Sequence, residues 1–307
     1  MSSIALHPPL RVRRAAGPSL APVLRHYFRF ASRVAPELAR RQAERLFTTP
    51  PRPRSVAPAA SPARRETVSA GRHDLAVWSA GPAGAPAVLL AHGWGGRGAQ
   101  MGTLATSLLA AGRRVVWFDQ PGHGDSGHGR VGLPDFVQAL HALVATHGPF
   151  YTAVGHSLGG AAIGLALRER ADFGRAVFIG APASMREHTL RFSALIGISP
   201  RVREAMRRRI EHRYNVRFDD IDRIDALGDV NVPALFVHDV DDAQVPFEHA
   251  LRLSAAMPQA RLLRTWGLGH NRVLKDAATV AAVTHFICGD EALPEVLPAL
   301  PQPAPIY

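Results

Sequence analysis

The sequence predicts an α/β protein, with a mostly parallel β-sheet that carries helices on both faces. From Thr67 onward, short continuous runs of valine, leucine and isoleucine alternate with stretches of helical pattern, as in strands buried on both sides. Segments rich in glycine, histidine and aspartate follow the ends of these runs, where ligands bind in parallel sheets. A hydrophobic content of 47% and a charged content of 20% in 307 residues are ordinary for a globular protein.

The net charge of +11 divides the chain into two parts. Residues 1–66 hold thirteen arginines and three glutamates, whereas residues 67–307 are almost neutral. We therefore predict a basic N-terminal arm with a proline-rich linker at 1–66 and a folded domain at 67–307. Arginine outnumbers lysine 35 to 1 along the whole chain, a bias typical of genome base composition. We thus expect no nucleic-acid partner, although the arm could make a weak contact with an anionic surface.

The arm has the pattern of one or two amphipathic helices broken near Pro36, followed by an extended linker. Its apolar positions at roughly helical spacing are Leu24, Tyr27, Phe28, Val34, Leu38 and Leu46. We expect the arm to be dispensable for chemistry. The alternative is that its apolar positions cover a face of the folded domain or mediate dimer contacts.

The single cysteine, Cys288, excludes an internal disulfide, so we expect a cytoplasmic protein. An organellar location is the alternative, because residues 1–35 contain no acidic residue, as in transit peptides.

The folded domain is predicted to alternate strands and helices in order. We expect strands at 74–80, 87–92, 113–119, 150–156, 175–181, 233–239 and 260–266, and helices at 100–111, 134–146, 158–170, 246–257 and 271–286. An insert at about 181–232 begins with a helical, arginine-rich stretch. The acidic stretch Asp219–Asp229 follows it and could pair with those arginines.

Ser157 is the candidate nucleophile. It is the centre of Gly155-His156-Ser157-Leu158-Gly159, which follows a predicted strand and precedes a predicted helix. In that setting the pattern G-x-S-x-G forms a sharp turn that exposes the serine hydroxyl.

With this motif, the chain resembles the α/β-hydrolase family over about residues 67–290. The matching segments are "HGWGG" (92–96), "DQPGHGDSG" (119–127), "HDVDDAQVP" (238–246) and "GLGH" (267–270). The resemblance implies the α/β-hydrolase fold with a helical cap made by the insert. It also implies a catalytic triad of Ser157, Asp242 and His270, with an oxyanion hole formed by the backbone N–H groups of Trp94 and Leu158.

Two assignments at this site have competitors. The match through Val245-Pro246 selects Asp242 as the triad acid, while Asp239 and Asp241 compete and could be solvated loop charges. His123, Asp125 and His128 suggest a metal site, but no known ligand spacing supports one, and the family turn accounts for them. We therefore expect neither a metal nor a cofactor.

The expected function is that of a serine hydrolase acting on a small-molecule carboxylic ester through an acyl-enzyme intermediate. Thioester hydrolysis, acyl transfer and carbon–carbon bond hydrolysis could use the same triad. A non-catalytic interaction protein on a hydrolase fold is a further alternative. The arginine-rich insert favours a substrate with an anionic portion.

Overall fold

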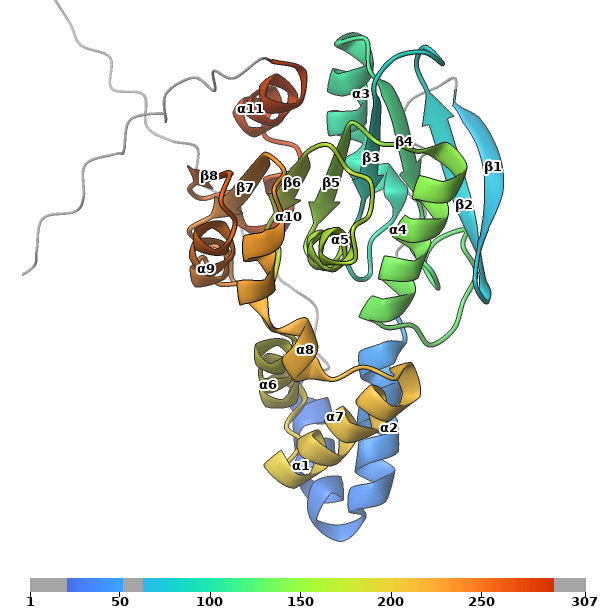
Figure 1. Cartoon of the computed structure of the whole chain (residues 1–307). Helices are drawn as coiled ribbons and strands as arrows, with labels where there is room; N and C mark the ends of the chain where they lie inside the picture. The colour runs from blue at the N-terminus through green and yellow to red at the C-terminus, as the bar shows by residue number, and fades with distance from the viewer. Residues whose placement is uncertain (1–20, 52–62, 290–307) are drawn as a thin grey trace, which may run out of the picture.

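The computed structural model describes residues 21–51 and 63–289. Within them, eight strands form one sheet in the order β1-β2-β4-β3-β5-β6-β7-β8 (Figure 1). The strands are β1 (Arg64–Ala70), β2 (His73–Ala80), β3 (Ala87–Ala91), β4 (Arg114–Phe118), β5 (Thr152–His156), β6 (Ala176–Ile179), β7 (Ala234–Asp239) and β8 (Ala260–Thr265). Strands β3 to β8 pair in parallel, while β1 and β2 are antiparallel to their neighbours. The mostly parallel sheet predicted from the sequence is confirmed.

The helices cover both faces of this sheet because successive strand residues point to opposite sides. Val88 and Leu90 pack with α3 (Gly102–Ala110) and α11 (Ala277–Cys288). Leu89 and Ala91 belong to the core on the other face, with α4 (Leu133–His147), α5 (Leu158–Arg168) and α9 (Glu248–Ala256). Every residue of β3, β5, β6 and β7 is buried, which explains why these strands are continuous apolar runs.

Two elements of the folded domain differ from the sequence prediction. The first strand, β1, is an edge strand whose charged residues 64–66 resemble the preceding linker, so its apolar pattern is too short to recognise. The predicted helix at 271–286 is two helices, α10 (Gly269–Arg272) and α11. The break occurs because Asp276 accepts a hydrogen bond from the Thr279 N–H (2.8 Å) and so caps a new helix.

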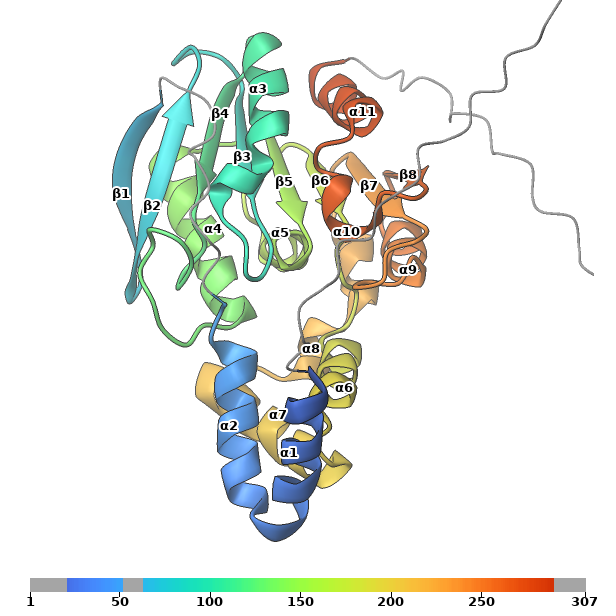
Figure 2. The same ribbon diagram turned by 180° about the vertical axis from the view of Figure 1, so that it is seen from behind.

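The arm helices pack against the helical insert instead of standing apart from it. Helices α1 (Ala21–Val34) and α2 (Pro36–Thr48) lie beside α6 (Met185–Ile196) and α7 (Pro200–Tyr214), at one end of the molecule (Figures 1 and 2). The remaining short helices are α8 (Phe218–Ile221) and two 3₁₀ turns at Gly98–Met101 and Ile224–Asp229. The predicted break near Pro36 is confirmed, and the two arm helices pack on α6 and α7, the helices of the cap insert. No helix among the described residues is long and apolar enough to cross a membrane.

The buried face of the arm is not the one that its large apolar residues predict. Of the six apolar positions, only Phe28 is buried, and the other five are exposed or partly exposed. The other fully buried apolar residues of the arm are Ala31, Ala39 and Ala43. Alanine has no side chain beyond Cβ, so helix backbones can approach closely at these positions. Burial in the arm therefore depends on small residues, which a search for large apolar side chains misses.

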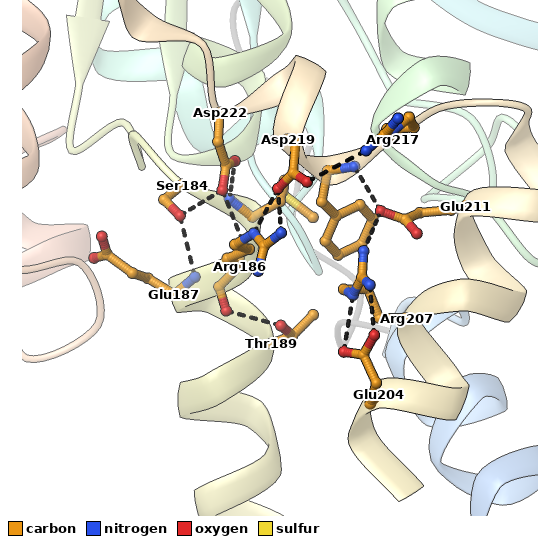
Figure 3. Close-up of polar contacts among 12 residues, drawn as sticks. Ser184, Arg186, Glu187, Thr189, Glu204, Arg207, Glu211, Arg217, Asp219 and Asp222 are labelled. Carbon is orange, nitrogen blue, oxygen red and sulfur yellow. Dashed lines mark hydrogen bonds and ion pairs between the residues drawn. The ribbon is translucent and has the colours of Figure 1, made fainter. Parts of the chain in front are cut away.

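The opposite charges of the insert form ion pairs, as its sequence suggests. Arg186 of α6 pairs with Asp219, and Arg207 of α7 pairs with Glu204 and Glu211 (Figure 3). Asp222 accepts hydrogen bonds from the N–H of Met185 (2.6 Å) and the hydroxyl of Ser184 (2.7 Å) at the start of α6. Several of the arginines are thus engaged within the cap.

Candidate active site

Ser157 stands at a sharp turn between β5 and α5. Its backbone has φ 52° and ψ −123°, a conformation that non-glycine residues rarely adopt and that is typical of a nucleophile elbow. The two flanking positions have no room for a side chain. A Cβ on Gly155 would lie 2.5 Å from Gly160 Cα, and one on Gly159 would lie 2.5 Å from Ala91 O. The Ser157 N–H donates to Ile179 O at 2.8 Å. The turn is therefore held by the ends of two neighbouring strands.

Asp242 and His270 form a buried hydrogen-bonded pair. Asp242 comes from the loop after β7 and His270 from α10, and their Oδ2 and Nδ1 atoms are 2.6 Å apart. Burial alone would raise the pKa of the Asp242 carboxyl, but the hydrogen bonds from His270 and from the Val245 and Gln244 N–H groups outweigh it and lower that pKa. Because the carboxylate is ionised, His270 donates from Nδ1. With Nδ1 as the donor, a neutral imidazole has its acceptor nitrogen at Nε2, which can take a proton.

The histidine pair lies directly beside the serine turn. His156, the residue before Ser157, has its ring centroid 4.7 Å from that of His270, and its Nε2 donates to His270 O at 2.8 Å. A Cβ at Gly180, whose φ is +59°, would lie 3.2 Å from His270 Nδ1, so the missing side chain makes room for the ring. No hydrogen bond joins Ser157 Oγ to His270 in the described part of the chain. Catalytic hydrogen bonds of this kind often tighten only when substrate is bound.

The loop that holds Trp94 packs against Ser157. A Cβ on Gly93 would lie 2.7 Å from Ser157 Cβ. Within residues 21–51 and 63–289, neither the Trp94 nor the Leu158 backbone N–H donates a hydrogen bond. Two donors near the serine are thus available to a developing oxyanion.

Histidines of the neighbouring segments fix this loop. The Gly95 N–H donates to His123 Nε2 at 3.0 Å, and the Gln120 N–H donates to His92 Nε2 at 2.9 Å. Burial lowers the pKa of His123 to about 4, which keeps it neutral and able to accept this bond. Among the described residues, no group of three or more histidine, cysteine or acidic side chains could hold a metal ion. His123 therefore has a structural partner in the Trp94 loop.

Asp239 and Asp241 lie near the site but bond elsewhere. Asp239 is buried, and its Oδ2 accepts from the Thr265 hydroxyl (2.8 Å) and the Leu268 N–H (3.0 Å). The expectation that Asp239 could be a solvated loop charge is therefore wrong. Asp241 is exposed and accepts from the Gly267 N–H at 2.9 Å. Both carboxylates support the loop that leads to His270, and neither is bonded to its ring.

A cavity beside the Trp94 loop includes residues that the sequence did not point to. Trp94 and Leu158 line it together with Phe47 and Thr48 of the arm and with residues of the cap. The sequence separates Phe47 from Trp94 by a proline-rich stretch and carries no pattern that links them. His156, by contrast, lies inside the G-x-S-x-G motif, but the contact with His270 is a tertiary one.

Comparisons with known proteins show which family the chain is similar to. The sequence pattern described as "Alpha/beta hydrolase family" matches residues 88–302, more than half of the chain. The "Putative carbamate hydrolase RutD" of Variovorax paradoxus (strain S110) is 31% identical over 243 residues, covering 64% of this chain and 90% of that protein.

Two solved structures illustrate the likeness in fold. The esterase RhEst1 from Rhodococcus sp. ECU1013 has a TM-score of 0.56 at 21% identity, over 73% of this chain and 98% of that one. The thioesterase domain from the curacin biosynthetic pathway has a TM-score of 0.56 at 19% identity, over 74% of this chain and 99% of that one. The fold and the matched sequence pattern agree, and the chain belongs to the alpha/beta hydrolase family of hydrolytic enzymes.

Proposed function

We propose that the protein is a serine hydrolase that cleaves carboxylic esters through an acyl-enzyme intermediate. Ser157 is the nucleophile, His270 the general base and acid, and Asp242 the residue that orients His270. The observation that carries this proposal is the 2.6 Å bond between Asp242 and His270, beside a serine in a strained turn.

The first half of the reaction forms the acyl-enzyme. Ser157 Oγ attacks the ester carbonyl carbon while His270 Nε2 takes the hydroxyl proton. The carbonyl oxygen becomes an oxyanion that accepts from the Trp94 and Leu158 N–H groups. As the carbon–oxygen bond to the alcohol breaks, His270 returns the proton to the departing oxygen.

The second half releases the acid. Water attacks the acyl carbon, His270 removes a proton from it, and Ser157 leaves with that proton. Asp242 keeps the imidazole in the correct tautomer and stabilises its cationic form in both halves.

Carbamate hydrolysis is the second candidate, favoured by the name of the 31% identical relative. A carbamate presents the same carbonyl to the same nucleophile. Thioester hydrolysis, acyl transfer and carbon–carbon bond hydrolysis remain alternatives on this triad, since fold does not select the substrate.

Turnover of matched substrates tests the proposal. We expect phenyl acetate to be hydrolysed faster, by kcat/KM, than S-phenyl thioacetate or phenyl N-methylcarbamate. Ser157→Ala should lower kcat by about 10⁴-fold or more, whereas Ser69→Ala, on the exposed face of β1, should leave it unchanged. Folded wild-type protein that hydrolyses no ester, or a Ser157→Ala variant with full activity, would contradict the proposal.

A further inference from the structure

We propose that the arm helix α2 forms one wall of the acyl pocket, and that Phe47 restricts the acyl group to a short, uncharged chain. This inference rests on the proposed function and deepens it by naming the substrate class.

The cavity beside the oxyanion loop is built by three separate parts of the chain. Trp94 and Leu158 come from the folded domain, Phe47 and Thr48 from α2, and Met185 with Ile210 from the cap. Because the two residues that carry the proposed oxyanion donors line it, a carbonyl held by those donors would direct one substituent into the cavity. The acyl substituent is the better occupant, since it stays attached to Ser157 while the alcohol must leave.

The end of α2 is fixed in place on both sides of the cavity. The Val131 N–H donates to Thr48 O at 2.8 Å. The buried Glu44 carboxylate pairs with Arg130 at 3.2 Å and with Arg213 of α7 at 3.1 Å. This helix end is thus bonded to the folded domain and to the cap, as a pocket wall must be.

The arm also touches the oxyanion loop itself. A Cβ on Gly95 would lie 2.9 Å from Pro51 Cγ. This contact supports the alternative, that the arm covers a face of the folded domain; if α2 forms a wall of the pocket, the arm is not dispensable for chemistry.

The cavity lining carries no formal charge. No aspartate, glutamate, lysine or arginine lines it. His188 lines the cavity beside the Phe47 ring, and desolvation together with the nearby Arg191 charge lowers its pKa, so this side chain is neutral at neutral pH. Arginines Arg186 and Arg207 of the cap are paired with acidic residues (Figure 3). An uncharged acyl group fits this lining better than the anionic portion that the arginine-rich sequence suggested.

The cavity is small, and Phe47 helps to close it. Its ring lies 5.0 Å from that of Phe192 and 5.5 Å from that of His188, centroid to centroid. The cavity has a volume of about 40 Å³, which leaves little room for a long chain. A short acyl chain therefore fits this cavity better than a long one.

Kinetics on p-nitrophenyl esters of increasing chain length test the role of Phe47. For the wild type we expect kcat/KM to fall at least tenfold between butyrate and octanoate, since one misfitting methylene is worth about 10-fold or more in a closed pocket. Phe47→Ala should raise the octanoate-to-butyrate ratio of kcat/KM about tenfold or more, and Phe47→Leu should raise it less. Leu46→Ala, whose side chain is exposed on the same helix, is the matched control and should keep the wild-type ratio.

Methyl butyrate and monomethyl succinate test the charge preference, and we expect kcat/KM to favour the butyrate by about tenfold or more. A preference for the succinate, or an unchanged chain-length ratio in folded Phe47→Ala and Phe47→Leu variants, would overturn the pocket proposal alone. Wild-type protein that hydrolyses none of these esters would overturn the proposed function, and the pocket proposal with it.

Discussion

At the scale of single residues, three aspartates within four positions have three different environments. Asp242 is bonded to His270, Asp239 is buried and bonded to Thr265 and Leu268, and Asp241 is exposed. Identical side chains should therefore respond differently to the same substitution.

Asp242→Asn should lower kcat by about 10⁴-fold, because an amide cannot support the cationic imidazole or select its tautomer. Asp239→Asn should lower the melting temperature by several degrees with a smaller loss of kcat, and Asp241→Asn should change both little. Kinetics and thermal unfolding of the three variants separate these effects. A crippling loss of kcat in a folded Asp239→Asn or Asp241→Asn protein would show that the acid is assigned to the wrong residue.

At the scale of elements, the start of α6 is stabilised by a residue that follows the end of another helix, α8. Asp222 follows α8 and accepts from the Ser184 hydroxyl and from the N–H groups of Met185 and Arg186 (Figure 3). A carboxylate at this position satisfies free donors and interacts favourably with the helix dipole. The two ends of the cap insert are thereby joined.

Asp222→Ala should lower the free energy of unfolding by about 1–2 kcal/mol, the usual cost of losing a helix cap. Asp225→Ala is the control, since Asp225 is exposed and, among the described residues, pairs with Arg223 alone. It should change stability by less than about 0.5 kcal/mol. Urea unfolding curves compare the two, and equal losses would mean that Asp222 does not act as a cap.

The sequence predicted the strands, helices and motifs that neighbouring residues in the chain reveal by themselves. Strands such as β5 and β7 are continuous apolar runs, and Ser157, Asp242 and His270 belong to short motifs that follow them. The features that the sequence did not predict depend on contacts between residues far apart in the chain. The charged residues 64–66 make β1 resemble the linker that precedes it. Helix α2 packs through the small residues Ala39 and Ala43, so its buried face carries no pattern of large apolar side chains. Phe47 reaches the pocket only because α2 packs on α7, which no spacing along the chain records.

At the scale of the whole molecule, one apolar core runs from the sheet through the cap into the arm. Phe28 and Ala39 belong to the same buried cluster as Leu89 of β3. Around this core, burial keeps several histidines neutral. It lowers the pKa of both His123 and His156 to about 4, and that of His92 well below its ordinary value.

These histidines should make the protein sensitive to acid. In the unfolded chain each binds a proton near pH 6.5, whereas in the folded protein His123 and His156 bind one only near pH 4. Between these values the unfolded state holds more protons, so stability falls as pH falls, by about 1.4 kcal/mol per pH unit for each histidine. Urea unfolding at pH 7.5 and pH 5 measures the difference. Equal stability at the two values would contradict the buried, neutral state of these rings.

The central claim is that Ser157 is a nucleophile activated by His270. Reaction of the folded protein with a fluorophosphonate, followed by mass spectrometry of peptides, tests it most directly, because only an activated serine is rapidly phosphonylated. The account predicts one adduct, on Ser157, that is absent in Ser157→Ala and forms at least 100-fold more slowly in His270→Gln. An adduct on another residue, no adduct on the folded wild type, or labelling of Ser157 at the wild-type rate in His270→Gln would contradict it.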